Sequence, residues 1–289
     1  MIKNRSTQSW LLFIALSLIW GSAFLLIKRG NEAFTPLQGA SIRILTGAIV
    51  LCPIALRNLR KKYSKQEWLF LFISGLVGSY TPAMLFATAQ TSITSSTAGV
   101  LSSLTPVFTA IISILFFKNK LSAHQYFGLA LGLLGAIMLA TLKDGSIDFS
   151  NMSWLLVVGA TFCYAINLNF LKFKLEKVEP FTIAAMSLFL VSPFALFNLF
   201  NSDFTSRLIP ENTDSFLYLI LLGATATSLA LILFNKLLKI ASPQFASSTT
   251  YAIPVIAICW GIFDNEVINQ FQLIAITCIL GGLFLLKKS

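Results

Sequence analysis

The sequence predicts an all-α integral membrane protein with ten transmembrane helices. Composition, the spacing of apolar runs and the distribution of basic residues all lead to this prediction. Of the 289 residues, 56% are hydrophobic and only 11% are charged, whereas about 25% are charged in an ordinary soluble domain. A folded chain of about 300 residues still exposes roughly a quarter of its unfolded surface. Such an apolar chain therefore requires lipid as its solvent.

Ten apolar runs are each long enough to cross a bilayer. A hydrocarbon core of about 30 Å is crossed by about 20 helical residues, and the runs lie between charged or Pro-, Asn- and Ser-rich breaks. The predicted spans are residues 9–27, 37–56, 67–87, 97–117, 123–142, 153–171, 181–200, 215–235, 244–263 and 270–286. Roughly 90 residues remain for loops and tails, and the chain has no Walker A motif. We therefore expect no catalytic domain and no enzymatic activity.

Basic residues predict how the chain is oriented. Sixteen Lys and Arg residues lie in the alternate segments that begin with the N-terminus, and four lie in the others, namely Lys28, Arg29, Lys143 and Arg207. Basic residues concentrate in cytoplasmic loops, so both termini are expected in the cytoplasm. The net charge of +10 is scattered between apolar runs and forms no basic face, which argues against a nucleic-acid partner. The expected location is the plasma membrane, or the cell inner membrane of a Gram-negative source.

The chain also contains an internal repeat. Its halves are residues 1–145 and 146–289. They align at an offset of 144 residues at first, which pairs Trp20 with Tyr164, and at an offset of 148 residues from Leu69 onward. Each half has five predicted spans, and this odd number gives the second half the opposite orientation. Inverted-topology repeats are characteristic of secondary transporters, whose substrate site lies near the midplane at the repeat interface. The sequence therefore predicts a secondary membrane transporter.

Several segments resemble a known family. They are Leu18-Ile19-Trp20-Gly21-Ser22, Phe34-Thr35-Pro36 before the span that carries Arg43, Leu104-Thr105-Pro106-Val107 and Ala252-Ile253-Pro254-Val255. In these segments the chain resembles the EamA-type carriers of the drug/metabolite transporter superfamily, and the resemblance covers nearly the whole chain, twice. It implies ten helices, with the first four of each half around a central cavity and the fifth and tenth at the periphery. It also implies export of small organic metabolites such as amino acids or related compounds.

One feature departs from the family pattern. In the family an acidic residue usually follows each Pro-containing span, and Glu266 matches this position in the second half. The corresponding stretch of the first half, 117–121, contains no acid. The departure argues against a functional pair of symmetric acids.

Arg43 is the only Lys or Arg residue within a predicted span, and it lies away from the span ends. An ionised side chain there is costly and usually faces a cavity or a partner, and a planar guanidinium suits a carboxylate. Arg43 lies seven residues after Pro36, or about 10 Å along a helix. It therefore also has two structural interpretations: it extends to the membrane interface, or it pairs with helix-end carbonyls.

Polar and aromatic residues near the midplane predict a substrate pocket. An aromatic wall with a few hydroxyl and amide groups suits a small, partly apolar solute. Taken singly, such residues more often pack or bond to a neighbouring helix carbonyl. The predicted substrate-binding residues are Trp20, Arg43, Tyr80, Ser103, Tyr164, Asn167, Thr227 and Tyr251.

The acidic residues indicate how transport is coupled. All eleven lie in loops or at span ends, so no midplane carboxylate is available to exchange a proton for a cation. We therefore expect a neutral or zwitterionic cargo. Transport is expected to run as facilitated diffusion or exchange, or to be coupled through a span-end group such as Glu266. One histidine and four scattered cysteines predict no metal site, and no cofactor is expected.

Prolines and glycines suggest hinges and packing contacts. Pro106 and Pro254 occupy equivalent places in the two halves and predict hinges at a gate, or static kinks. Small residues on the fifth and tenth spans predict close helix packing, or a homodimer contact through these helices. They are Gly128, Gly132, Gly135, Gly281 and Gly282.

Two alternatives to metabolite export stay open. Within transport, the chain could carry drugs or nucleotide sugars, although a nucleotide sugar requires several cationic residues at cavity depth and Arg43 is alone there. In a different class, the chain could be a non-transporting membrane scaffold or receptor. The partners expected for a transporter are the lipid bilayer and a small-molecule substrate.

Overall fold

The computed structural model describes residues 2–117, 122–143, 146–147, 152–240 and 249–287. The first part contains α1 (Ile2–Gly30), α2 (Pro36–Leu59), α3 (Lys65–Gly75), the π-helix η1 (Leu76–Tyr80), α4 (Thr81–Ala89), α5 (Ser95–Ser102), α6 (Thr105–Phe117) and α7 (Ala123–Thr141). Two-residue strands, β1 (Leu142–Lys143) and β2 (Ser146–Ile147), pair antiparallel. The second part contains α8 (Trp154–Lys174), α9 (Pro180–Phe200), the short 3₁₀ turns η2 (Phe204–Arg207) and η3 (Pro210–Asn212), α10 (Thr213–Leu222), the π-helix η4 (Gly223–Leu229), α11 (Ala230–Ile240), α13 (Thr249–Phe263) and α14 (Gln270–Lys287).

Local sequence signals set where several helices begin. Thr35 caps α2 and exchanges hydrogen bonds with Gln38, and Ser64 and Glu67 do the same at the start of α3. Each pair forms a capping box, which satisfies backbone N–H groups that have no partner in the first turn. Thr94 caps α5 through the N–H of Thr97. These caps fix the beginnings of the helices that surround the candidate site.

Seven segments of the described chain are long and apolar enough to cross a membrane, and three shorter apolar helices accompany them. The shorter ones are Ala123–Leu139, Ala252–Phe263 and Gln270–Gly282. All ten fall on predicted spans, but length and composition support a crossing for only seven. The count of ten crossings therefore stays a prediction.

Three predicted spans are not single regular helices. The span at 67–87 is α3, η1 and α4 in sequence, and the span at 215–235 is α10, η4 and α11. The span at 97–117 is interrupted between α5 and α6. There Pro106 lacks an N–H and cannot donate to the Ser102 carbonyl, which instead accepts a hydrogen bond of 2.9 Å from the Thr105 hydroxyl.

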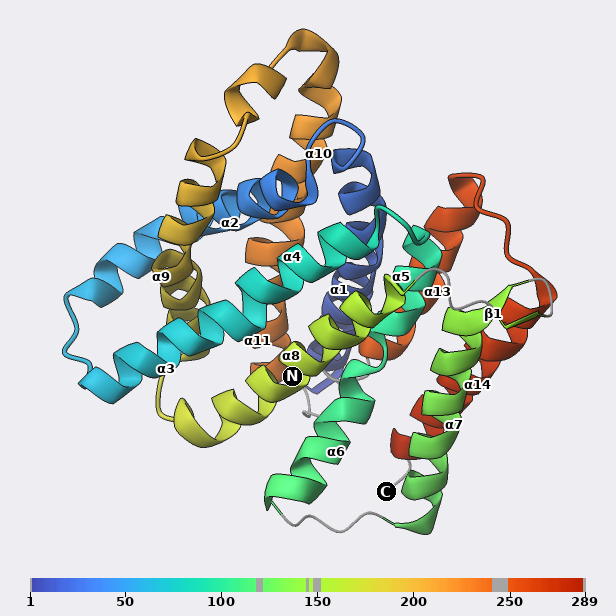
Figure 1. Cartoon of the computed structure of the whole chain (residues 1–289). Helices are drawn as coiled ribbons and strands as arrows, with labels where there is room; N and C mark the ends of the chain where they lie inside the picture. The colour runs from blue at the N-terminus through green and yellow to red at the C-terminus, as the bar shows by residue number, and fades with distance from the viewer. Residues whose placement is uncertain (1, 118–121, 144–145, 148–151, 241–248, 288–289) are drawn as a thin grey trace.

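Helices α2 and α9 lie side by side and antiparallel, and polar contacts join them at both ends (Figure 1). At one end the Gln38 amide donates to the Asp203 carboxylate at 2.8 Å. At the other end the Thr182 hydroxyl donates to the Asn58 side-chain carbonyl at 3.0 Å. The outer face of this pair is apolar, with Phe200 80% exposed.

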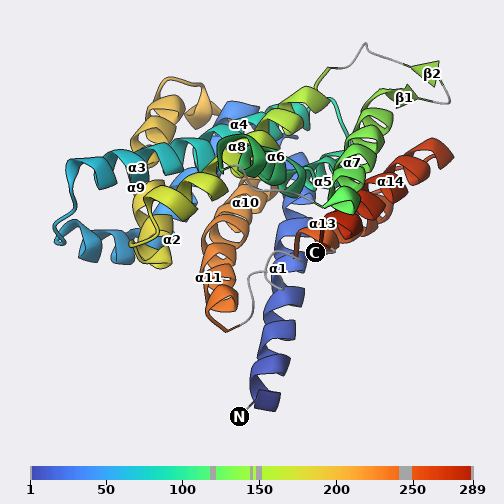
Figure 2. The same cartoon turned by 90° about the horizontal axis from the view of Figure 1, so that it is seen from below.

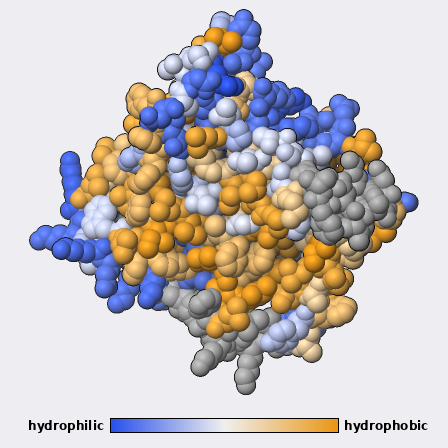
Figure 3. Space-filling view, in the orientation of Figure 1, coloured by the Kyte–Doolittle hydropathy of each residue, from blue (hydrophilic) through white to orange (hydrophobic). Residues whose placement is uncertain are grey.

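Apolar residues cover most of the face shown in Figure 3, and hydrophilic residues gather at its upper and left margins. A soluble monomer rarely exposes a continuous apolar surface of this kind. The distribution fits an integral membrane protein whose lateral surface contacts lipid.

Helices α7 and α14 form a closely packed pair on one side of the molecule (Figure 2). A Cβ on Gly282 would lie 2.5 Å from the Gly128 carbonyl oxygen and 2.6 Å from the Gly132 nitrogen, and one on Gly135 would lie 2.7 Å from the Ala275 carbonyl. Gly281 is less crowded, with its nearest neighbour 3.6 Å away. These glycines bring two helices of one chain together, so they give no separate support to a homodimer, which stays a prediction.

Candidate functional site

Arg43 contacts the π-helical segment η4 from the neighbouring helix α2. Its Nε donates to the Thr227 hydroxyl at 2.9 Å, and Thr227 is buried. The helices approach closely because position 223 is glycine: a Cβ there would lie 2.6 Å from the Arg43 carbonyl oxygen. No carboxylate in the described part of the chain forms an ion pair with Arg43. The positive charge of Arg43 is therefore not neutralised by an acidic side chain of the described residues.

Trp20 of α1 completes the hydrogen bonding of η4. In the π-helical pattern the Ala230 N–H donates to the Thr225 carbonyl, so the Ala226 carbonyl loses the donor it would have in an α-helix. The Trp20 indole N–H donates to that carbonyl at 3.2 Å. The Trp20 ring also packs against Phe234, with centroids 5.5 Å apart.

Aromatic rings form a wall beside Arg43. Tyr164 of α8 stacks on Phe86, with centroids 6.1 Å apart and planes 30° apart, and Phe24 meets Phe86 edge to face. The Tyr164 hydroxyl lies within electrostatic reach of the Arg43 guanidinium. Four of the predicted site residues thus meet around η4: Trp20, Arg43, Tyr164 and Thr227.

A second group surrounds the other π-helical segment, η1. The Ser74 hydroxyl donates to the Asn167 side-chain carbonyl at 2.9 Å. A Cβ on Gly78 would overlap the Asn167 amide, so glycine is required for this contact. The Tyr80 hydroxyl accepts a hydrogen bond of 2.5 Å from Asn198. Asn167 and Tyr80, the other two predicted residues with contacts between helices, therefore lie at η1.

The remaining predicted residues are placed differently. The Ser103 hydroxyl donates to the Val100 carbonyl at 2.6 Å, so its hydrogen bond stays within its own turn. The side chain of Tyr251 lies outside the described residues. Pro106 is the second residue of α6, and Pro254 lies inside α13.

Sequence reasoning missed the two π-helical segments. Such segments are rare and occur frequently at functional sites. Gly75 precedes η1 and Gly223 begins η4, and the two glycines align at the 148-residue offset of the repeat. This pair was the available signal, although glycine alone does not distinguish a π-helical turn from close packing.

A cluster of charged groups joins α1, α5 and the connection between α13 and α14. The Lys28 ammonium lies 3.0 Å from the Glu266 carboxylate and 2.5 Å from that of Asp264. Arg29 pairs with Asp264 and, at 2.7 Å, with Glu32. The sequence predicts only a topology role for Lys28 and Arg29, because Asp264 and Glu266 lie more than 230 positions away in the chain.

Glu266 is held in its ionised form. Its carboxylate accepts hydrogen bonds from the backbone N–H groups of Ser95 and Ser96, both at 3.0 Å, and from the Ser95 hydroxyl at 2.6 Å. Burial raises the pKa of Glu266, but the hydrogen bonds from Ser95, Ser96 and Lys28 outweigh it and hold the pKa at about 2. The acid at this span end therefore stays charged throughout the physiological pH range.

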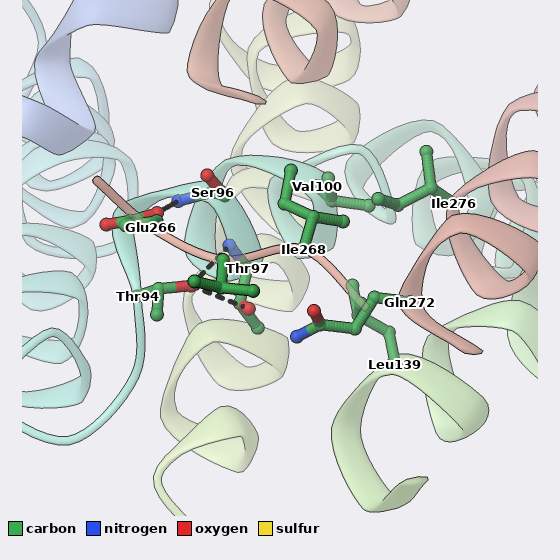
Figure 4. Close-up of a pocket in the computed structure, with 10 residues that line it drawn as sticks. Thr94, Ser96, Thr97, Val100, Leu139, Glu266, Ile268, Gln272 and Ile276 are labelled. Atoms are coloured by element: carbon green, nitrogen blue, oxygen red, sulfur yellow. Dashed lines mark hydrogen bonds between the residues drawn. The ribbon is translucent and has the colours of Figure 1, made fainter. Parts of the chain in front are cut away.

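A small pocket that opens to the surface lies beside Glu266. Thr94, Thr97, Ile268 and Gln272 are among its lining residues, and Figure 4 shows them below and beside the contact between Glu266 and Ser96. None of the residues grouped around η4 or η1 lines it. The pocket therefore belongs to the end of the bundle and is separate from the Arg43 group.

Curated relatives are transporters of low sequence identity. The uncharacterized transporter YvbV of Bacillus subtilis is 26% identical over 263 residues, which cover 89% of this chain and 84% of YvbV. An S-adenosylmethionine/S-adenosylhomocysteine transporter of Chlamydia trachomatis is 24% identical over 254 residues, which cover 84% of this chain and 77% of that protein. The match to another B. subtilis relative, the uncharacterized transporter YdfC, covers 54% of this chain and only 51% of YdfC, at 26% identity.

A solved structure, described only as a crystal structure of a protein, shares the fold with a TM-score of 0.67 and 16% identity, over 96% of both chains. The EamA-like transporter family matches the sequence twice, over residues 8–141 and 151–287. These two matches cover nearly the whole chain. The protein therefore belongs to the EamA-like transporter family.

Proposed function

We propose that the chain exports a small zwitterionic metabolite, an amino acid or a related compound, and that Arg43 holds its carboxylate. The observation that carries this proposal is the setting of Arg43: a guanidinium within a predicted span, fixed through Nε by Thr227 and without an acidic partner among the described residues. A guanidinium binds a carboxylate through two parallel hydrogen bonds. The aromatic wall of Tyr164 and Phe86 suits the apolar part of such a cargo.

The contacts of the two π-helical segments support an inverted repeat as the basis of transport. A Cβ on Gly223 would crowd the carbonyl of Arg43, and one on Gly75 would overlap the carbonyl of Ser187. Gly75 aligns with Gly223, and Arg43 aligns with Ser187, at the offsets of the repeat. Each half thus contacts the other through equivalent positions, and the proposed cargo site lies where the halves meet.

The alternatives receive less support. S-adenosylmethionine, named for the Chlamydia relative, carries an amino-acid group and would use the same contact at Arg43. A nucleotide sugar requires more cationic groups than Arg43 supplies. A scaffold would not require an unpaired guanidinium within a span.

Efflux from proteoliposomes tests the proposed class. Vesicles containing the purified protein and loaded with a panel of labelled amino acids and related metabolites should release at least one of them faster than protein-free vesicles do. Release should saturate with concentration. If every member leaks at the protein-free rate, the export proposal is wrong.

The expected topology has ten crossings with both termini in the cytoplasm, because Lys and Arg concentrate in alternate segments. We expect this arrangement in the plasma membrane, or in the inner membrane of a Gram-negative cell. A reporter fused after Ser289 should report the cytoplasm, and one inserted between Lys143 and Asn151 should report the opposite side. The same side for both would contradict the ten-span topology.

A further inference from the structure

The π-helical segment η1 has a backbone acceptor without a donor from its own helix. The Thr81 N–H donates to the Leu76 carbonyl, so the Val77 carbonyl loses the partner it would have in an α-helix. The next residue that could donate to it in the π pattern is Pro82, which has no N–H. No side chain of the described residues takes the place of that donor. The Val77 carbonyl oxygen, which lies in a half-buried segment, is therefore able to accept a hydrogen bond from a ligand.

In η4 the corresponding backbone carbonyl already has a hydrogen-bond donor. There the Trp20 indole donates to the Ala226 carbonyl. The residue that aligns with Trp20 in the second half is Tyr164, and its ring instead stacks on Phe86. The two segments thus have the same type of backbone but differ in their free hydrogen-bond acceptors. In η4 the Ala226 carbonyl is bonded to Trp20, whereas in η1 the Val77 carbonyl can accept a hydrogen bond from a ligand.

Asn167 supplies a second acceptor at the same place. Its side-chain carbonyl takes one hydrogen bond, from Ser74, and an amide oxygen has two lone pairs. The missing side chain of Gly78 lets the Asn167 amide lie directly against η1. On α8, Asn167 lies three residues after Tyr164, so the two side chains share a face about 4.5 Å apart along the axis. Tyr164 lies within electrostatic reach of Arg43, and α2, which carries Arg43, also contacts η1, so Arg43 and Asn167 lie near one another beside α8.

From this arrangement we infer that η1 and Asn167 bind the ammonium group of the cargo while Arg43 holds its carboxylate. The Val77 carbonyl and the Asn167 amide oxygen accept the ammonium hydrogens. An α-amino acid carries its two charged groups on one carbon, which suits a cationic site and an acceptor site that lie side by side on neighbouring elements. The inference rests on the proposed function and narrows it to cargo with a free amino group next to its carboxylate.

Two probes that differ only in the amino group test this inference, L-phenylalanine and 3-phenylpropionate. Calorimetric titration of the purified full-length protein should show phenylalanine binding about tenfold more tightly, because hydrogen bonds to a charged group are strong. Asn167→Ala should abolish this preference without weakening 3-phenylpropionate. Asn169→Ala is the matched control, because the Asn169 amide donates to the Ala165 carbonyl of its own helix, and it should keep the preference.

Pro82→Ala tests the backbone acceptor directly. The substitution supplies an N–H five residues after Val77, which can donate to the open carbonyl, and it should also abolish the preference for phenylalanine. This variant removes no polar side chain and adds no bulk. It therefore keeps the test decisive if Asn167→Ala fails to fold.

Three outcomes would overturn the inference. Equal affinity of the wild type for both probes would refute the ammonium site but would not contradict the carboxylate site at Arg43. Binding of neither probe, together with no release of any amino acid above the protein-free rate in the efflux panel, would refute the amino-acid class and the inference with it. A gain in affinity when Na⁺ replaces choline in the buffer, lost in Pro82→Ala, would show that the carbonyl binds a sodium ion instead.

Discussion

Arg43→Gln is expected to raise the half-saturation concentration for a carboxylate-bearing cargo roughly 10- to 100-fold. The change removes the charge and the paired donors that bind the carboxylate, and hydrogen bonds to charged groups contribute about 1.5 to 3 kcal/mol. Gln can still donate to Thr227, which accepts from Arg43 at 2.9 Å, so the packing of α2 against η4 should survive. Efflux from proteoliposomes over a range of cargo concentrations measures the effect.

Arg43→Lys provides the matched control for this substitution. A lysine keeps the charge but lacks the planar pair of donors, so it should restore affinity only in part. The amount of folded protein extracted from the membrane should be similar for all three forms. Wild-type half-saturation in Arg43→Gln would show that Arg43 is an interfacial anchor, and the carboxylate assignment would fail.

Glu266→Gln is expected to destabilise the fold without changing how transport depends on pH. The folded-state pKa of Glu266 is about 2, below its ordinary value of 4.5. The ionised carboxylate therefore contributes stability that is fully present above pH 4.5 and is lost as the pH falls towards 2. A shift of this size corresponds to a contribution on the order of 3 kcal/mol. Unfolding by sodium dodecyl sulfate at pH 7 should show a loss of this order in Glu266→Gln.

Because Glu266 stays charged, it cannot take up and release protons between pH 5.5 and 8. Efflux should then proceed without a pH gradient, and an imposed gradient should change it little in both the wild type and Glu266→Gln. A zwitterion moving without a coupled ion carries no net charge across the membrane potential. Uphill accumulation driven by a pH gradient in the wild type, and abolished in Glu266→Gln, would make Glu266 the proton carrier and refute this assignment.

The sequence predicted the features that depend on composition and on local pattern. The predicted span 181–200 corresponds to α9 at Pro180–Phe200, because a run of apolar residues after a proline at a helix start is a strong local signal. Arg43 stood out because a charge within a span is rare. These observations concern one segment at a time, which is why a single sequence was sufficient.

Contacts between distant segments were not predictable in the same way. The partners of Glu266 are Lys28, Ser95 and Ser96, and no spacing rule connects positions so far apart. The π-helical turns η1 and η4 likewise have no periodicity of their own in a uniformly apolar run. They depend on which side chains of other helices satisfy the backbone, as Trp20 does for η4.

The polar contacts at both ends of α2 and α9 constrain how the molecule can move. Helix α2 belongs to the first half of the sequence and α9 to the second. A hydrogen bond joins Gln38 to Asp203 at one end of the pair, and another joins Thr182 to Asn58 at the other end. A rigid-body rotation of one half against the other would break both hydrogen bonds in every transport cycle. If the proposed transporter moves one half against the other, the helices that move least are therefore expected to be α2 and α9, one from each half.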